Sequence, residues 1–329
     1  MKVLFIGGTG NISSACTDAA LKKGFEVFHL NRGTHAELKA EDVVTLKADI
    51  NDTETVRMLT AGLHFDSIVQ WIGYTALDMK RDIELFRGKT AQYIFISSAS
   101  AYQKPSRSYI ITESTPLINP YWQYSRDKIA CEQVLTEAYA KEGFPMTIVR
   151  PSHTYGEGWI PTPFGSSEFT VPQRMLDGKE IIVPGDGQSL WTVTHTTDFA
   201  KGLVGLLCND KAIGEAFHIT SDEALTWDTI HRIIAEALGV TPKIVHIPSD
   251  FIASLFPEHI GNLLGDKSNS VVFDNTKIKR AVPDFICSTP FSVGVRRSIE
   301  WLEAHPEKKV VNHKMNEQIE AILKAFKKA

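Results

Sequence analysis

The 329-residue sequence has few of the residues that build metal centres, disulfide frameworks or membrane anchors. Its four cysteines are scattered, at positions 16, 131, 208 and 287, and form no C-x-x-C pair. This spacing predicts neither a metal site nor a disulfide framework. No apolar run is long enough to cross a bilayer, and the first predicted strand begins at residue 2, which leaves no room for a signal peptide. These absences predict a cytoplasmic protein that binds no membrane.

An excess of positive charge is also missing. Lysine and arginine together number 35 and aspartate and glutamate 39, which gives a net charge of −4. A chain with this balance lacks the excess of positive charge by which proteins bind the phosphates of nucleic acid, so we expect no nucleic-acid partner. The 43% of hydrophobic and 22% of charged residues are those of an ordinary globular protein, and the length suffices for one large or two modest domains.

The N-terminal stretch MKVLFIGGTGNIS has the pattern of a dinucleotide site. Residues 3–6 form a continuous apolar run, glycines follow at once, and residues 12–23 have helical periodicity. Gly7 allows the tight turn, Gly10 lets a pyrophosphate approach the backbone, and the helix N-terminus attracts its negative charge. An ordinary strand–helix turn is the alternative, but the context favours a cofactor. Ser13 stands where a third glycine is usual, and its small side chain should preserve the helix–strand packing.

The end of the second predicted strand, residues 25–30, bears on the choice between NAD and NADP. An acidic residue at this place commonly binds the adenosine ribose of NAD, whereas an arginine accommodates the extra phosphate of NADP. This sequence has Asn31 followed by Arg32. A solvated surface arginine is the alternative interpretation, but a planar cation suits a phosphate. We therefore favour NADP(H) as the cofactor, with NAD(H) as the alternative.

Strands and helices alternate up to residue 151. Further strands are expected at 43–46, 67–71, 92–96 and 146–149, and helices at 52–62, 76–87 and 121–143. This order predicts an α/β fold with a Rossmann-type, doubly wound parallel sheet. Ligands of such folds bind at the carboxyl ends of the strands, where the sequence places the glycine turn, Arg32, Asp49, Gln70 and Ser98.

Tyr124 and Lys128 lie four residues apart on the predicted helix 121–143, so their side chains share one face. A free tyrosine titrates near pH ~10, and its pKa must be lowered before it can act as acid and base near neutrality. A neighbouring cation lowers this pKa because it stabilises the phenolate. The spacing is common by chance. Together with the glycine turn and with Ser98 at a strand end, it indicates an acid–base pair.

In this combination the sequence resembles the extended, epimerase/dehydratase-type branch of the short-chain dehydrogenase/reductase superfamily. The resemblance extends from residue 1 to about residue 306. It rests on GGTGNI at 7–12, DI at 49–50, SSASAY at 97–102, Tyr124 with Lys128, RP at 150–151, VPGDG at 183–187, DFA at 198–200 and GEAFHI at 214–219.

The resemblance implies roles for individual residues. Tyr124 would be the acid–base group, Lys128 would anchor the nicotinamide ribose and tune the phenol, and Ser98 would bind the substrate oxygen. Further dinucleotide contacts would come from Gly7, Gly10, Asn11, Ile12, Asn31, Arg32, Asp49, Ile50, Gln70, Pro151 and His153. Substrate contacts are expected from Ser100, His153, Trp159 and Trp191.

Two departures from the branch bear on the substrate. Trp191 stands about where nucleotide-sugar enzymes of the branch carry an arginine that binds the diphosphate. An indole cannot replace that bidentate contact, although it could stack on a ring. Dehydratases carry an Asp-Glu pair just after the active-site serine or threonine, where this chain has Ala99 and Ser100. Dehydration is therefore not expected.

From residue 152 the regular alternation lapses. Residues 1–151 are expected to form the dinucleotide-binding domain, and residues 152–306 mainly a smaller α/β substrate lobe from which some segments return to the main sheet. Residues 307–329 would form a C-terminal helical extension. Glycines and prolines between 156 and 165, around Trp159, predict a lid loop. The helices 76–87 and 121–143 resemble the pair that forms dimer bundles in relatives, so a homodimer is one alternative for the assembly.

The sequence therefore predicts an NAD(P)-dependent oxidoreductase or epimerase that acts on a hydroxyl or carbonyl carbon of a sugar-like small molecule, similar to nucleotide-sugar epimerases. A carbonyl reductase acting on a non-nucleotide substrate is the first alternative. The alternative of another class is a dinucleotide-sensing or RNA-associated protein without turnover. RNA-binding relatives have a similar glycine turn but a degraded catalytic tyrosine, whereas Tyr124 is present here.

Overall fold

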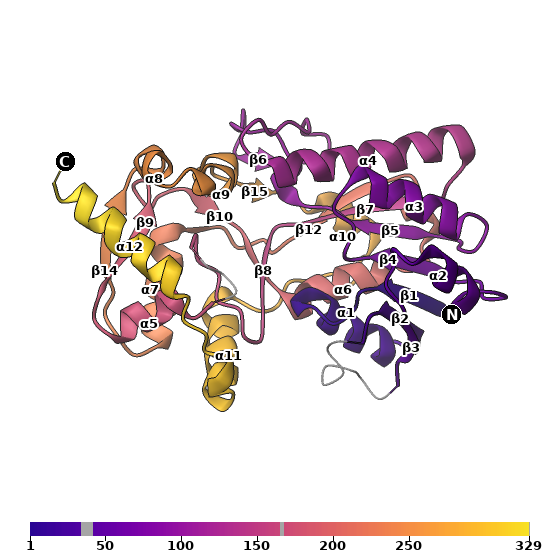
Figure 1. Cartoon of the computed structure of the whole chain (residues 1–329), viewed down its shortest axis with the longest axis horizontal. Helices are drawn as coiled ribbons and strands as arrows, with labels where there is room; N and C mark the ends of the chain where they lie inside the picture. The colour runs from indigo at the N-terminus through magenta and orange to yellow at the C-terminus, as the bar shows by residue number, and fades with distance from the viewer. Residues whose placement is uncertain (34–41, 165–167, 329) are drawn as a thin grey trace.

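The computed structural model describes residues 1–33, 42–164 and 168–328. Residue 165, at the end of the predicted lid loop, lies outside the described residues. Figure 1 shows two bodies: one built on a sheet and holding the N-terminus, the other a smaller lobe formed mainly by the second half of the chain. No helix of the described ranges is long and apolar enough to span a bilayer.

A seven-stranded sheet, in which all paired strands are parallel, organises the larger body. In space its strands follow the order β12–β7–β5–β4–β1–β2–β3, so the chain reverses its direction across the sheet between β1 and β4. Ligands of doubly wound sheets bind at such a switch point. The predicted Rossmann-type fold is thereby confirmed. The strands are β1 (Lys2–Ile6), β2 (Glu26–Asn31), β3 (Val44–Lys47), β4 (Ser67–Gln70), β5 (Tyr93–Ile96), β7 (Met146–Pro151) and β12 (Ala216–Ile219).

Helices cover both faces of this sheet, which explains why its central strands are largely apolar, as in VLFI of β1 and YIFI of β5. Residues 3–6 of β1 are fully buried between the two helical layers. One layer contains α1 (Asn11–Lys22) and α6 (Thr196–Leu206), and the other α2 (Thr53–Leu59), α3 (Ala76–Phe86) and α4 (Gln123–Glu142) (Figure 1). The short α10 (Thr276–Ala281) packs against α6 and β12. Segments from the second half of the chain therefore complete the first body.

The smaller lobe combines short strand pairs with helices. Its parallel pairs are β9 (Glu180–Pro184) with β14 (Lys243–Ile247), β8 (His153–Tyr155) with β11 (Val193–His195), and β6 (Ile110–Ile111) with β15 (Val272–Phe273), and β10 (Leu190–Trp191) pairs antiparallel with β13 (Leu225–Thr226). Its helices are α5 (Thr170–Leu176), α7 (Trp227–Ala237), α8 (Ser249–Leu255), α9 (Ile260–Asn262), α11 (Phe291–Ala304) and α12 (His313–Phe326), and a π-helical turn, η5 (Leu263–Lys267), follows α9. Single turns of 3-10 helix occur at η2 (Ala99–Ala101), η3 (Asp210–Ala212), η4 (Pro257–His259) and η6 (Pro306–Lys308).

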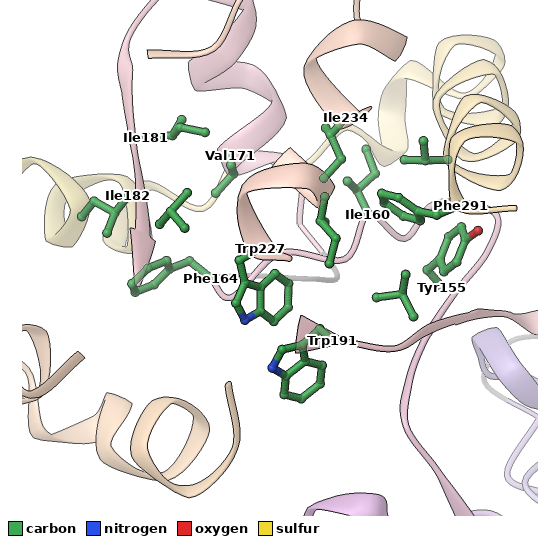
Figure 2. Close-up of a cluster of buried hydrophobic side chains, with 14 of the residues drawn as sticks. Tyr155, Ile160, Phe164, Val171, Ile181, Ile182, Trp191, Trp227, Ile234 and Phe291 are labelled. Carbon is green, nitrogen blue, oxygen red and sulfur yellow. The ribbon is translucent and has the colours of Figure 1, made fainter. Parts of the chain in front are cut away.

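The core of the lobe is drawn in Figure 2, where aliphatic side chains from α5, β9 and α7 point toward one another. The C-terminal helix α12 belongs to this core, because Ile319, Ile322 and Leu323 on one of its faces are buried in the same cluster. The segment expected as a C-terminal extension therefore packs on its own chain and forms part of the lobe.

Candidate active site

Gly7 and Gly8 form the turn between β1 and α1, and both have a backbone conformation that favours glycine, with φ angles of +104° and +102°. A Cβ atom on Gly8 would lie 2.7 Å from the ring of His29, which is buried beneath the turn. His29 is held there by Thr17, whose Oγ1 lies 2.9 Å from the Nε2 atom of the ring. The turn therefore brings bare backbone to the surface where a ligand can approach it.

Ser13, in place of a third glycine, closes the first turn of α1. Its hydroxyl oxygen accepts a hydrogen bond from the Gly10 N–H at 2.8 Å, and its side chain is buried. This burial agrees with the expectation that a serine preserves the close packing of the helix.

A cavity of about 630 Å³, which we call the dinucleotide cavity, opens beside the glycine turn at the carboxyl ends of β1 and β2. Eight of the predicted cofactor contacts line it: Gly7, Gly10, Asn11, Ile12, Asn31, Arg32, Asp49 and Ile50. The rest of its wall includes residues that were not predicted as cofactor contacts, among them Trp71, Tyr74, Asp78 and Arg81.

Two buried donors in the wall of the dinucleotide cavity indicate a polar ligand. The amide nitrogen of Asn11 and the indole nitrogen of Trp71 have no hydrogen-bond partner among the described residues. Buried donors are normally paired in proteins. The N-terminus of α1 adds backbone N–H groups that suit an anion. These features fit a dinucleotide, whose phosphates and ribose hydroxyls are acceptors.

Gln70 does not lie where the sequence predicted it, beside the dinucleotide. Its side chain is fully buried, and its Nε2 atom donates to Asp82 Oδ2 at 2.5 Å while its Oε1 atom accepts from the Ile72 N–H at 2.8 Å. Asp82 also accepts from the Tyr93 hydroxyl at 2.6 Å. A buried carboxylate is stable only when it accepts hydrogen bonds. The bond to Asp82 therefore orients the side-chain amide of Gln70. Gln70 thus holds the segment of Trp71 and Ile72, which does line the cavity.

A second cavity, of about 430 Å³, adjoins the first, since Ile12, Thr154 and Trp159 line both. We call it the reaction cavity. Besides Ile12, its wall includes seven of the predicted residues: Ser98, Ser100, Tyr124, Pro151, His153, Trp159 and Trp191. Pro151 and His153, which were expected beside the dinucleotide, lie on the reaction side of the junction.

Tyr124 lies in the first turn of α4, where its ring packs 5.0 Å from the ring of Trp122. Burial raises the pKa of the phenol to about 12, while a hydrogen bond with Ser98 acts in the opposite direction. The predicted lowering of this pKa by Lys128 is not seen in this structure, where burial is the largest influence on the phenol and raises its pKa. The phenol therefore keeps its proton at neutral pH and can donate it.

Lys128 is buried one turn further along α4. Its ammonium nitrogen donates to the carbonyl oxygens of Gly73 at 2.7 Å and Ile96 at 2.9 Å, and it lies over the rings of Tyr74 and Phe95, at 4.8 Å and 4.7 Å from their centroids. Burial lowers the pKa of Lys128 to about 8. Since an ammonium has three donors, one is left for a ligand. Tyr74 lines the dinucleotide cavity, and the Lys128 ammonium lies against the ring of Tyr74.

Three serine hydroxyls form a chain at the reaction cavity. Ser125 donates to the Ser100 oxygen at 2.8 Å, and the Ser100 and Ser98 oxygens are 2.9 Å apart. The Ser98 oxygen also accepts the Ser100 N–H at 3.2 Å. Because Ser100 already receives the Ser125 proton, it can donate its own to Ser98, whose proton is then available to a phenol or substrate oxygen. Ser100 is thus a positioning residue as well as part of the cavity wall.

Trp191 and Trp227 lie side by side at the edge of the lobe core, with ring centroids 5.1 Å apart (Figure 2). Both indole nitrogens donate to the carbonyl oxygen of Lys267, at 3.1 Å and 3.0 Å. Trp191 is only 2% exposed, so it is a fixed part of the cavity wall. No guanidinium is offered to a diphosphate at this position.

The two histidines near the cavity are not acid–base groups in this geometry. Burial, assisted by the charge of Lys267, lowers the pKa of His153 to about 3, so its ring is neutral. His195 caps α6, with Nδ1 placed 2.7 Å from the Thr197 hydroxyl. Its role is structural.

The wall of the reaction cavity also includes residues that were not predicted as site residues, among them Lys104, Trp122, Asp266 and Lys267. Lys104 follows the serine-rich segment 97–102 by two residues, and this proximity was the one available signal for it. Asp266 and Lys267 belong to the π-helical turn η5, in a stretch where hydrophobic periodicity gave no prediction.

Two adjoining cavities at the carboxyl edge of a parallel sheet, one with a bare glycine turn and one with a tyrosine–serine pair, define the class of dinucleotide-dependent α/β enzymes. The chain belongs to the NAD dependent epimerase/dehydratase family, whose sequence model matches residues 3–220. The predicted resemblance to extended short-chain dehydrogenases/reductases, and the prediction of an NAD-dependent enzyme of epimerase or oxidoreductase type, are thereby confirmed.

Relatives of the chain differ in their named activities. It is 24% identical to 2'-dehydrokanamycin reductase from Streptomyces kanamyceticus, over 87% of this chain and 80% of the relative. It is 27% identical to the chloroplast stem-loop binding protein of 41 kDa b from Arabidopsis thaliana, over 76% of this chain and 67% of the relative. The structure of the epimerase Mth375 from Methanothermobacter thermautotrophicus superposes with a TM-score of 0.77 at 19% identity, covering 93% of each chain, and shares the fold.

Proposed function

We propose that the chain transfers a hydride between a nicotinamide dinucleotide and a hydroxyl or carbonyl carbon of a sugar-like small molecule. One observation carries this proposal: Tyr124 and Ser98 share a cavity that meets the dinucleotide cavity at Ile12, Thr154 and Trp159. A carbon held beside Tyr124 would therefore lie near the junction, where the reactive end of a dinucleotide extending from the glycine turn would arrive.

When bound, the nicotinamide supplies or accepts the hydride. In the direction of reduction, the Ser98 hydroxyl donates a hydrogen bond to the substrate oxygen, and the serine chain from Ser125 and Ser100 holds it in that orientation. Tyr124, protonated at neutral pH, gives its proton to the same oxygen as negative charge develops there. In the direction of oxidation, the phenolate takes the proton back.

Lys128 would bind the ribose of the dinucleotide with its remaining N–H donor. Because Tyr74 lies over the ammonium and is 50% exposed, we expect this ring to move aside when the ribose binds. The charge of Lys128 would then act on Tyr124 at shorter range through a ribose hydroxyl, which assists the proton transfer.

The dinucleotide is proposed to be NADP(H), with NAD(H) as the alternative that the family description favours. Arg32 is exposed and lines the dinucleotide cavity, so its guanidinium can reach a phosphate on the adenosine ribose. The neighbouring Asn31 uses its side-chain oxygen to accept the Gly33 N–H at 2.9 Å. A carboxylate that would bind the ribose hydroxyls of NAD is missing from this position.

Two candidate reactions remain within this proposal. An epimerase keeps its dinucleotide and returns the hydride to the other face of the same carbon, whereas a reductase releases the dinucleotide. The family name includes epimerases, and the chain is similar to a named reductase. The buried Trp191, which stands in place of a diphosphate-binding arginine, favours a reductase acting on a non-nucleotide substrate.

Further proposals concern the partners and the location of the protein. Similarity to a stem-loop binding protein makes RNA the rival ligand, but the net charge of −4 disfavours it. A homodimer through α3 and α4 is proposed because Leu77 of α3 is 74% exposed, although the neighbouring Lys80 and Glu84 are charged. The molecular mass of the protein in solution tests this proposal, since a homodimer has twice the 36.6 kDa of one chain. Four cysteines without a disulfide fit a reducing cytoplasm.

The deciding experiment incubates the purified chain with the reduced or the oxidised form of NADP or NAD and a panel of ketoses, keto-sugars and nucleotide sugars. Loss of nicotinamide absorbance identifies a reductase, and conversion of a sugar without net change in absorbance identifies an epimerase. The Tyr124→Phe variant serves as the matched control. Binding of stem-loop RNA that resists a salt series, with no turnover of either kind, would contradict the proposal.

A further inference from the structure

Two lysines line the reaction cavity although they are almost completely buried. Lys104 and Lys267 are 2% and 9% exposed, and they come from different segments, the first just after η2 and the second at the end of η5. An ammonium group that is taken out of water is costly unless a negative partner compensates it. Two such groups in one cavity therefore need an explanation.

The two lysines differ in their partners. Lys267 Nζ lies 2.9 Å from Asp266 Oδ2 and forms an ion pair with it. Within the described part of the chain, the Lys104 ammonium has neither an acceptor nor an ion-pair partner, and only its backbone N–H is bonded, to the Ile118 carbonyl at 2.8 Å. Burial and the charge of Lys267 lower the pKa of Lys104, against the opposing influence of Asp266. Among the residues lining this cavity, two cations therefore face a single anion.

The position of Lys267 is built into the lobe. Its carbonyl oxygen accepts the two indole N–H groups of Trp191 and Trp227, at 3.1 Å and 3.0 Å. Its ammonium lies over the rings of Trp191 and Trp122, at 5.0 Å and 6.0 Å from their centroids. Contacts with three tryptophans thus hold Lys267 at the cavity wall. A solvated surface lysine has no such set of contacts.

Trp122 links Lys267 to Tyr124. The Lys267 ammonium lies 6.0 Å from the centroid of the Trp122 ring, and the Tyr124 ring packs against the same indole with its centroid 5.0 Å away. Both lysines, Trp122 and Tyr124 line one cavity of about 430 Å³, so a small substrate that contacts Tyr124 is enclosed by the same wall as the two cations.

We propose that the substrate carries an anionic group, a carboxylate or a phosphate, which Lys104 and Lys267 bind while Tyr124 and Ser98 act on its carbonyl or hydroxyl carbon. This inference rests on the function proposed above for the same cavity. Lysines act as point charges and suit a single anionic group, in contrast to the bidentate arginine that Trp191 replaces. A neutral or cationic sugar would leave the Lys104 ammonium buried without a partner.

The test measures binding, so that it does not depend on turnover. The full-length chain is titrated by calorimetry, with and without NADPH, with glucose, glucosamine, gluconate and glucose 6-phosphate. We expect gluconate or glucose 6-phosphate to bind about tenfold or more tightly than glucose, and glucosamine to bind least well. The stronger of the two anions tells a carboxylate site from a phosphate site.

Variants connect this preference to the two lysines. Lys104→Met and Lys267→Met should each lower the ratio of anionic-probe affinity to glucose affinity about tenfold, whereas Lys104→Arg should retain most of the preference. Lys211→Met, an exposed lysine on η3, is the matched control and should bind as the parent does. Thermal unfolding of each variant shows that it is folded.

Three results would overturn the inference: equal affinity for glucose and the anionic probes, an anion preference that survives in both methionine variants, or no saturable binding of either anion. None of these depends on hydride transfer. If the lysine-dependent preference is found while Tyr124→Phe matches the parent in turnover, the proposed acid–base function fails and the anion site stands.

Discussion

The ammonium nitrogen of Lys128 lies 5.8 Å from the centroid of the Tyr124 ring, one helical turn away on α4. Both groups are buried, and burial shifts their pKa values toward the neutral forms, to about 12 for the phenol and about 8 for the ammonium. At neutral pH the pair is a protonated phenol beside a charged lysine. In this state the Tyr124 phenol can donate its proton to a carbonyl oxygen.

The first prediction concerns the pH dependence of the two directions. Reduction needs the protonated phenol, so its kcat/KM should stay level from about pH 6 to about pH 8. Oxidation needs the phenolate, whose fraction below the pKa of about 12 rises tenfold for each pH unit, and its kcat/KM should rise accordingly. Initial rates in both directions measure this. An oxidation rate that levels off near pH 7 would show that Tyr124 is already ionised there.

The second prediction is the loss of turnover in Tyr124→Phe. Removing the phenol oxygen should lower kcat by about 100-fold or more, because general acid–base catalysis contributes at least that much. The dinucleotide should bind as before, since the Tyr124 side chain lies in the reaction cavity. Tyr121→Phe is the control, because Tyr121 is exposed and outside the wall of that cavity. Equal activity of the two variants would exclude Tyr124 as the acid–base group.

The third prediction follows from the lowered pKa of Lys128. The folded value of about 8 lies below the model-compound value of 10.5 that applies to the unfolded chain. Between these values the unfolded state binds more protons, so the stability that depends on Lys128 rises with pH over this range. The free energy of unfolding, measured in urea, should therefore increase from about pH 8 to about pH 10 relative to that of Lys128→Met. A constant difference between the two proteins would mean that the lysine is not buried as described.

Several elements could be predicted from local sequence, and their success has a physical reason. The runs VLFI of β1 and YIFI of β5 are apolar because helices cover both faces of the sheet, and the glycine turn has a positive φ that only glycine adopts easily. A helix was predicted to begin at Asp52, and Asp52 caps the N-terminus of α2 by accepting the Thr55 N–H at 3.2 Å. These features depend on neighbours in the chain, which a sequence shows directly.

Other features depend on residues far apart in the chain, and local pattern could not give them. Gln70 was assigned to the dinucleotide by its position after a strand, but the buried carboxylate of Asp82 turns its side chain away. The pKa of Tyr124 depends on how deeply the phenol is buried, which the spacing to Lys128 does not reveal. Lys104 and Lys267 share one cavity only because η5 folds against the active-site segments.

The fourth prediction tests the cofactor preference. Arg32→Ala should lower the affinity for NADPH about tenfold or more and leave that for NADH nearly unchanged, because only NADPH carries the phosphate that the guanidinium would bind. Asn31→Asp is the complementary variant, since a carboxylate at this position repels the phosphate and can bind the ribose hydroxyls of NADH. Fluorescence titration measures both. Tighter binding of NADH than of NADPH by the parent would contradict the preference for NADP(H).

The fifth prediction concerns the buried ion pair behind the reaction cavity. Arg150 on β7 donates to both carboxylate oxygens of Glu132 on α4, at 2.9 Å and 2.6 Å, and Ser97 donates to the same carboxylate at 2.5 Å. Glu132→Gln keeps the shape but leaves the arginine charge buried without a counter-ion. We expect a loss of about 3–5 kcal/mol in the free energy of unfolding.

Glu142 forms an ion pair with Arg87 between the ends of α4 and α3, and both side chains are largely exposed. It is the matched control, because water already solvates both of its charges. Glu142→Gln should cost less than about 1 kcal/mol. Urea denaturation of the two variants compares them on the same helix. Similar losses would mean that Glu132 is solvated in the folded protein, and α4 would then not be anchored to β7 in the way that positions Tyr124.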